Sequence, residues 1–347
     1  MTFDSIFVPD DLAAAVADEA WLAAMLEAET ALAAAQADAE IITREAADAV
    51  AAACRRSYDL GGREAANPVV PLARALREAA PEAHKGATSQ DILDTAAMLV
   101  ARRARELIMV QLDGVVDACG GLADEHRATV MAGRTLMQEA QPITFGLKAA
   151  GWLAGVASAR EGLAQVELAA QLGGPVGVMP PALTARFAER LELAAPPLPW
   201  HTDRTRVARL GAALAVAAGA CEKVALDLVL LSEAREVAEA SEGGRGGSSS
   251  MPHKRNPVGA IRARAAARHV RGAAGVLFEA MAGEHERAAG AWQSEWGALS
   301  AALAGTGGAA WSLREALDGL TVHPHDVDGT PDQTVVDDLI DRALELE

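Results

Sequence analysis

Seven apolar residues recur at alternating steps of four and three near the middle of the chain. This spacing places them along one face of an α-helix, and a mean period of about 3.5 residues is typical of helices that pack against others over their whole length. Such a helix needs several long partners, so it constrains much of the chain to supply them. The residues of this seam are Leu210, Leu214, Ala217, Cys221, Val224, Leu228 and Leu231.

The composition is suited to supplying such partners. Hydrophobic residues make up 51% of the 347 residues, whereas aromatic residues make up only 3%, and alanine is abundant. Alanine is the strongest helix former, and small side chains let helices approach one another closely. A chain of this length can also bury a large core. We therefore predict an all-α fold, built as a long helical bundle.

Helical periodicity recurs on both sides of the seam. It predicts helices within residues 9–56, over 72–80, from about 91 through 112, over 147–172 and over 257–281. Residues 67–71 read Asn-Pro-Val-Val-Pro and are predicted to be a loop, because the residue before a proline favours extended backbone. Thr330 to Gln333 resembles a capping box that begins a final amphipathic helix.

The net charge indicates which binding partners to expect, and the cysteines indicate the cellular compartment. The net charge of −17 argues against a nucleic-acid partner, because phosphate binding needs a basic face. The apolar seam contains Glu222 and Lys223, which excludes a membrane span. Cys54, Cys119 and Cys221 lie far apart in helical patterns, so we expect buried free thiols. We see no signal peptide and expect a cytoplasmic protein.

A glycine- and serine-rich arm joins two of the predicted helices. Residues 243–257 read Gly-Gly-Arg-Gly-Gly-Ser-Ser-Ser-Met-Pro-His-Lys-Arg-Asn-Pro. Glycine reaches backbone conformations that are closed to other residues. Lys254 and Arg255 add two cations, Asn256 adds an amide, and Pro257 suits the first turn of the next helix. An arm that carries hydroxyls beside cations could close over an anionic substrate. The alternative is a flexible linker.

Two further polar segments interrupt the helical pattern. Residues 84–91 read His-Lys-Gly-Ala-Thr-Ser-Gln-Asp, and Thr88, Ser89 and Gln90 have groups that can hydrogen-bond a carboxylate. From these residues alone, a plain loop that caps the next helix through Ser89 or Asp91 is the alternative. Residues 133–146 read Gly-Arg-Thr-Leu-Met-Gln-Glu-Ala-Gln-Pro-Ile-Thr-Phe-Gly and form the other polar break.

Histidines occur in three later segments. Residues 200–204 read Trp-His-Thr-Asp-Arg, in which His201 could donate to a carboxylate or serve in a helix cap. Residues 284–286 read Glu-His-Glu and invite a metal site. Adjacent residues diverge by about 100° on a helix, however, so we predict no metal ligation there. The same reasoning applies to His323 and His325.

Several of these segments match motifs of a known family. Residues 247–257 match the G-S-S-x-M-P-x-K-x-N signature of the fumarase/aspartase superfamily. Residues 84–89 match its H-x-G-x-T-S loop, and residues 133–144 match its block G-R-T-H-x-Q-x-A-x-P-x-T. The Thr-Ser-Gln-Asp variant, the segment 200–204 and the segment 284–292 resemble the 3-carboxy-cis,cis-muconate cycloisomerase branch of that superfamily.

The resemblance implies roles for individual residues. Ser248, six positions before Lys254, would move the proton at carbon. Lys254 and Asn256 would stabilise the enolate-like charge that develops on a neighbouring carboxylate. No metal or organic cofactor is implied. The residues expected to contact the substrate are His84, Thr88, Ser89, Gln90, Arg134, Thr135, Gln138, His201, Ser249, Met251 and Arg255.

Leu136 is a departure from the family block that bears on the leaving group. In adenylosuccinate lyase a histidine at this position protonates a leaving amine, which a leucine cannot do. General acid catalysis is typically worth about 10²–10⁴-fold in rate. A carboxylate, with a pKa near ~4, leaves as a stable anion without that help. We therefore expect lactone chemistry rather than cleavage of a bond between carbon and an amine.

The resemblance implies a 3-carboxy-cis,cis-muconate cycloisomerase of aromatic degradation through the β-ketoadipate pathway. It adds a carboxylate to an alkene within one molecule and forms 4-carboxymuconolactone. The alternatives are an adenylosuccinate-lyase-like enzyme that releases fumarate and a non-catalytic oligomeric scaffold. We expect a homotetramer with active sites shared between subunits. The expected parts are an N-terminal helical domain (1–82), a central bundle (83–322) and a residual C-terminal helix (323–347).

Overall fold

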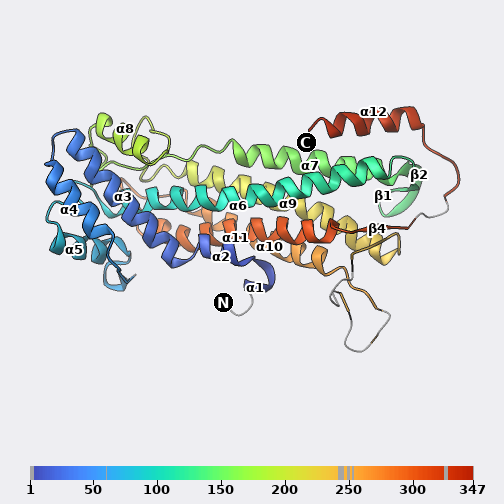
Figure 1. Ribbon diagram of the computed structural model, residues 1–347, viewed down its shortest axis with the longest axis horizontal. Helices are drawn as coiled ribbons and strands as arrows, with labels where there is room; N and C mark the ends of the chain where they lie inside the picture. The colour runs from blue at the N-terminus through green and yellow to red at the C-terminus, as the bar shows by residue number, and fades with distance from the viewer. Residues whose placement is uncertain are drawn as a thin grey trace.

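Long helices form the body of the molecule. The computed structural model describes residues 4–59, 61–240, 246–247, 251, 254–323 and 327–346. The long helices run along the horizontal axis of Figure 1, and each packs against at least two of the others. The predicted all-α helical bundle is thereby confirmed. Its long helices are α6 (Ser89–Glu125), α7 (Phe145–Ala164), α9 (Thr205–Glu233), α10 (Val258–Glu279) and α11 (Ala291–Leu317).

The predicted seam lies at the centre of this bundle. Every residue from Leu210 to Leu231 that was assigned to it is buried, and α9 packs against α7, α10 and α11. The seam is therefore filled within one chain. Cys221 in the seam and Cys119 on α6 are fully buried, and Cys54 is buried under α3, so the expectation of buried free thiols is confirmed. Burial raises the pKa of the Cys54 thiol to about 11.

Further helices gather at one end of the bundle, where α6 begins. In Figure 1 this end lies on the left and carries α3, α4, α5 and α8. We call it the Thr88 end, after the residue that precedes α6. The helices at this end are α3 (Asp18–Asp38), α4 (Arg44–Cys54), η1 (Arg63–Ala65), α5 (Val69–Ala79) and α8 (Pro181–Arg190). Helices α1 (Asp4–Phe7) and α2 (Asp10–Ala15) lie along the bundle and contact α11.

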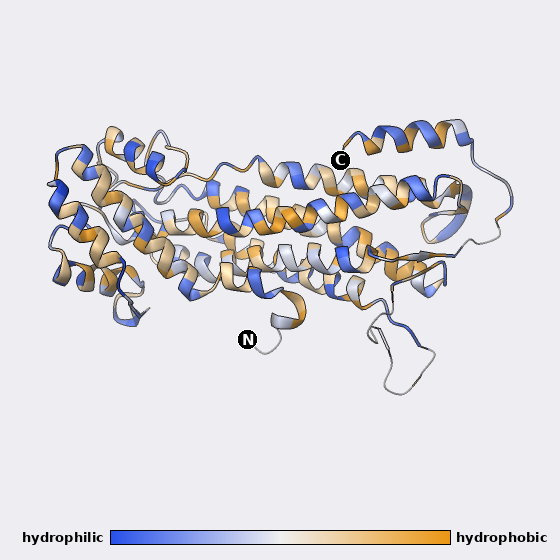
Figure 2. Ribbon diagram, viewed as in Figure 1, coloured by the Kyte–Doolittle hydropathy of each residue, from blue (hydrophilic) through white to orange (hydrophobic). Residues whose placement is uncertain are grey.

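Two small antiparallel sheets lie at the opposite end, which we call the hairpin end. Strands β1 (Val130–Thr135) and β2 (Gln138–Thr144) form a hairpin, so the polar break predicted at residues 133–146 is mostly β-structure. Strand β3 (Val237–Ala238) pairs with β4 (Thr321–Val322). The last helix, α12 (Gln333–Leu344), lies on α7 with its hydrophilic side outward in Figure 2.

Two of the predicted boundaries were wrong. The loop predicted over residues 67–71 ends early, because the Asn67 side chain accepts hydrogen bonds from the amides of Val69 and Val70 and starts α5 there. Pro71 then falls in the first turn, where its missing N–H is not needed. The helix predicted over 147–172 ends at Ala164. The backbone of Gln171 instead exchanges hydrogen bonds with the Thr95 hydroxyl on α6.

Two helix caps also differ from the prediction. The N-cap residue of α6 is Thr88 rather than Ser89, and Asp91 takes part from the third helical position, where its carboxylate accepts a hydrogen bond from the Thr88 amide and completes a capping box. The capping box expected from Thr330 is wrong as well. Asp332 caps α12, because its carboxylate accepts hydrogen bonds from the amides of Thr334 and Val335. Within the described ranges, no helix is long and apolar enough to cross a membrane.

Candidate active site

A buried carboxylate fixes the loop that precedes α6. Asp91 is fully buried on the first turn of that helix. It accepts hydrogen bonds from segments that are distant in sequence. It therefore holds the loop over residues 84–88, which we call the Thr88 loop, against residues 171–174 and 201. Its donors are the amides of Thr88 (2.9 Å), Gly173 (2.8 Å) and Gly174 (2.9 Å), Nε2 of Gln171 (3.0 Å) and Nε2 of His201 (2.9 Å).

The hydroxyls predicted to bind a carboxylate lie at the surface of this loop. Thr88 and Ser89 are both half-buried at the start of α6. The Arg287 guanidinium donates to the Thr88 hydroxyl and lies over the Trp292 ring, 5.8 Å from its centroid. Burial lowers the pKa of Arg287, while the nearby carboxylates of Asp91 and Asp94 act in the opposite sense. Among the described residues, no carboxylate lies within ion-pairing distance of this guanidinium.

Arg287 was missed by the sequence-based site prediction. Its signal was present in the segment 284–292, which resembles a cycloisomerase block, but that segment was weighed only for metal ligation. The structure places Arg287 beside Thr88, which lies 199 positions earlier in the sequence, and the two side chains form a hydrogen bond. A cation next to two hydroxyls is a suitable partner for a carboxylate.

Three other predicted residues at this end make contacts within the protein. His84 is buried with a left-handed backbone, and its ring Nδ1 lies 2.5 Å from the Glu29 carboxylate. His201 is buried against Asp91. The Gln90 amide nitrogen donates to the Asp94 carboxylate and to the His201 carbonyl. These side chains hold the loop in place, and direct contact with a substrate remains a prediction for each of them.

A buried ionic cluster lies directly behind the loop. The Arg204 guanidinium pairs with Asp94 on α6 and with Glu295 on α11, and all three side chains are 3% exposed. The Trp292 indole also donates to Asp94, at 2.9 Å. Burial raises the pKa of Glu295 although Arg204 opposes that shift. The cluster ties α6, α9 and α11 together beneath the Thr88 loop.

The second group of predicted residues lies at the hairpin end. Arg134 forms a bidentate ion pair with Glu236, next to β3. Thr135 and Gln138 face each other across the end of the hairpin and are exposed. Leu136 and Met137 form its tip, with φ of 51° and 66° and exposed fractions of 97% and 70%. A solvent-exposed apolar tip in a left-handed conformation is unusual for such residues.

The described part of the glycine-rich arm lies at the same end. Gly246 has a φ of 73°, and a Cβ there would lie 2.5 Å from the Asn256 carbonyl oxygen, so only glycine fits. Asn256 donates through its amide to the Gly246 carbonyl, which closes the arm at its base. Lys254, Arg255 and Met251 are exposed. Ser248 and Ser249 lie outside the described residues, so their predicted roles remain predictions.

The two groups are separated by the length of the bundle. Helix α6 has 37 residues and therefore spans about 55 Å at 1.5 Å per residue. It lies between Thr88 and the hairpin that carries Arg134. Helix α9 has 29 residues, or about 43 Å, and lies between His201 and Glu236, the partner of Arg134. One chain therefore does not bring the predicted site residues together.

Among the described residues, no group of His, Cys, Asp and Glu side chains is arranged to hold a metal ion.

A protein-family model described as lyase matches residues 9–272. The chain belongs to this lyase family. Its fold is that of the fumarase/aspartase-type helical bundles, as the similarity to solved structures shows.

Three relatives describe what the chain is similar to. Nitrosuccinate lyase of Streptomyces davaonensis is 47% identical over 341 residues, which cover 89% of this chain and 72% of that protein. The 3-carboxy-cis,cis-muconate cycloisomerase of Bradyrhizobium diazoefficiens is 40% identical over 335 residues, covering 89% and 74%. The 3-carboxy-cis,cis-muconate lactonizing enzyme of Pseudomonas putida superposes with a TM-score of 0.87 at 36% identity, covering 99% and 80%.

Replacing Arg204 tests whether the ionic cluster supports the Thr88 loop. Arg204→Met leaves Asp94 and Glu295 buried without their cation, so we expect the free energy of unfolding to fall by about 3–5 kcal/mol at pH 7. The deficit should shrink as pH falls, because the buried carboxyl with the raised pKa takes up a proton in the folded state. Urea unfolding between about pH 8 and pH 5 measures both.

The control for that experiment is Arg206→Met. Arg206 forms an exposed ion pair with Glu167, so its loss should change the free energy of unfolding by less than about 1 kcal/mol at any of these pH values. Equal effects of the two substitutions would show that the buried cluster does not hold this end of the bundle.

Proposed function

We propose that this lyase-family protein adds an acid anion to, or removes it from, the carbon β to a carboxylate, while the carbon between them gains or loses a proton. The substrate that we place first is 3-carboxy-cis,cis-muconate. One of its carboxylates bonds to an alkene carbon, the alkene electrons move onto a neighbouring carboxylate, and a proton is then delivered to the adjacent carbon. A lactone forms with no atom lost. The 36–40% identity to proteins named for this reaction supports the choice.

The roles of the residues follow from their chemistry. Thr88, Ser89 and Arg287 offer two hydroxyls and a cation for one substrate carboxylate. Lys254 and Asn256 offer a cation and an amide for the developing charge, which is where fixed donors lower a barrier most. Ser248 is proposed to carry the proton, its hydroxyl activated by Lys254 and by amides of the arm.

The separation of these residues implies an assembled site. Thr88 and Lys254 lie at opposite ends of a bundle about 55 Å long, yet both are proposed to touch one small substrate. A second copy that runs in the opposite direction would bring its hairpin end to the Thr88 end of the first. We therefore propose a homo-oligomer, with a homotetramer as the expected state, in which each site combines different subunits.

Leu136 limits which leaving groups the proposed reaction can have. It occupies the hairpin tip, 97% exposed, where it could reach into a site built with another copy. A leucine there supplies no proton, so the departing group must be stable as an anion. A carboxylate meets this condition and an amine does not. This argument opposes an adenylosuccinate-lyase-like reaction.

Elimination of nitrite from nitrosuccinate is a second candidate. The observation in its favour is the 47% identity to a protein named nitrosuccinate lyase. Nitrite, like a carboxylate, is the stable anion of an acid, so its departure also needs no proton donor at position 136. The same residues would then remove a proton from carbon while the C–N bond breaks and the alkene forms.

Parallel assays on the purified protein separate these reactions. We expect loss of diene absorbance with 3-carboxy-cis,cis-muconate, and we expect Ser248→Ala to lower kcat/KM by about 10²–10⁴-fold because the proton carrier is gone. Ser158→Ala, on an exposed face of α7, should have no effect. Release of nitrite and fumarate from nitrosuccinate alone would support the second candidate. Release of fumarate from adenylosuccinate would contradict the leaving-group argument.

Introducing a histidine at the hairpin tip tests that argument directly. We expect Leu136→His to change lactone formation by less than about twofold, because a carboxylate gains nothing from a general acid. The fold should tolerate the change, since the side chain is almost fully exposed. Met137→His is the matched control at the same tip. A tenfold or larger gain specific to Leu136→His would mean that the leaving group does need a proton.

A further inference from the structure

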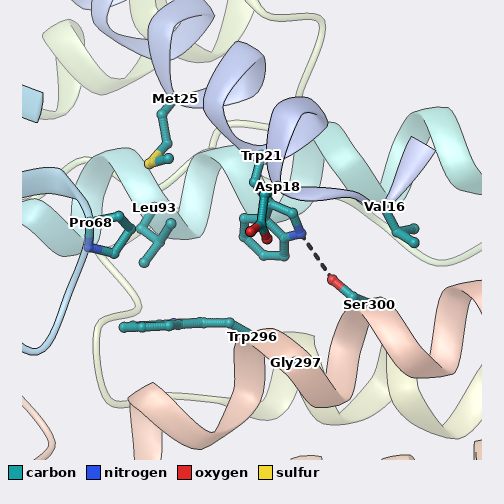
Figure 3. A pocket seen from close by; sticks show the side chains of 9 residues that line it. All are labelled: Val16, Asp18, Trp21, Met25, Pro68, Leu93, Trp296, Gly297 and Ser300. Atoms are coloured by element: carbon teal, nitrogen blue, oxygen red, sulfur yellow. Dashed lines mark hydrogen bonds between the residues drawn. The ribbon is translucent and has the colours of Figure 1, made fainter. Parts of the chain in front are cut away.

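An aromatic-walled cavity of about 250 Å³ lies between α3, α6 and α11. Its walls include the indoles of Trp21 and Trp296, with Met25, Leu93 and Pro68 beside them (Figure 3). An engineered apolar cavity of about 150 Å³ is known to hold benzene. This cavity therefore has room for a ring with a short side chain attached.

The two tryptophans are held in fixed orientations. The Trp21 indole donates to the Ser300 hydroxyl at 2.9 Å, which ties α3 to α11. Trp296 packs edge to face against Trp292, with ring centroids 5.0 Å apart, and Trp292 is itself bonded to Asp94. In Figure 3 the Trp296 ring is seen edge-on, so one of its faces is turned toward Leu93 and Trp21. The cavity walls are thus formed before any ligand arrives.

The polar side of the cavity is acidic. The Asp18 carboxylate lies beside Trp21 in Figure 3 and lines the cavity. Asp18 also lines an adjoining cavity of about 370 Å³, together with Glu19, Asp59 and Tyr58. Among the described residues that line the two cavities, none is basic. Clustered carboxylates at a cleft attract cations and repel anions.

We propose that this cavity binds an arylalkylamine, an aromatic ring joined to an amine through a short alkyl chain, in its ammonium form. The ring lies against the indoles of Trp21 and Trp296, and the ammonium group is directed toward Asp18. The indole faces favour packing of an aromatic ring, and the Asp18 carboxylate adds an ion pair with the ammonium group. Such a ligand is opposite in charge to the polycarboxylate of the proposed reaction, so this proposal does not depend on that reaction.

Three probes with one ring and different charges test the proposal. They are 2-phenylethylamine, 2-phenylethanol and phenylacetate, each titrated into the full-length protein by calorimetry. We expect the amine to bind with a Kd of about 1 mM or tighter. It should bind about tenfold tighter than the alcohol, and phenylacetate should bind more weakly still. Absence of binding by the amine, or equal binding of all three probes, would overturn the proposal.

Two variants and one control locate the binding. Asp18→Asn should reduce the advantage of the amine over the alcohol about tenfold, whereas Asp117→Asn, an equal change of charge on an exposed face of α6, should leave it unchanged. Gly297→Phe should abolish binding of both, because a Cβ there meets open space in the cavity wall. Its helix should form at least as well as with glycine. Binding that survives Gly297→Phe in the folded protein would place the ligand elsewhere and refute the site.

Discussion

The length and stiffness of the long helices determine what one chain can do. Helix α6 keeps the Thr88 loop and the Arg134 hairpin about 55 Å apart, because its 37 residues rise by 1.5 Å each. At the Thr88 end, the buried carboxylates of Asp91 and Asp94 join segments from three parts of the chain. A carboxylate-binding surface can thus be complete at one end while its catalytic partners lie at the other. With the proposed residue roles, an active site would be a property of the assembly.

The chemistry of the leaving group complements this geometry. The hairpin tip exposes Leu136 and Met137 to solvent in a single chain, with backbone angles that neither residue prefers. Such a tip is explained if another copy covers it. Apolar side chains delivered to a polycarboxylate site would exclude water without supplying a proton. That arrangement suits a reaction in which an acid anion departs or adds, as in both reactions named for the relatives.

The sequence predicted the long helices well because their apolar periodicity is an internal property of each segment. It predicted less well where a distant partner decides the structure. Residues 165–172 continue a helical pattern, yet Gln171 is drawn into hydrogen bonds with Thr95 and Asp91. The hairpin at 130–144 carries no apolar alternation, so its strands could not be predicted. Arg287 meets Thr88 only through the fold. The separation of the candidate site residues is nonetheless visible in the sequence, because a long helix lies between each polar segment and the next.

Mixing two inactive variants tests most directly whether the site is shared. Thr88→Val removes a group at one end and Lys254→Met a group at the other, and each should be inactive alone. If different subunits supply these residues, random hybrid oligomers contain about a quarter of intact sites and should regain about that fraction of wild-type turnover. If native mass spectrometry shows that hybrids form and the mixture stays inactive, both residues act within one chain and the account is wrong.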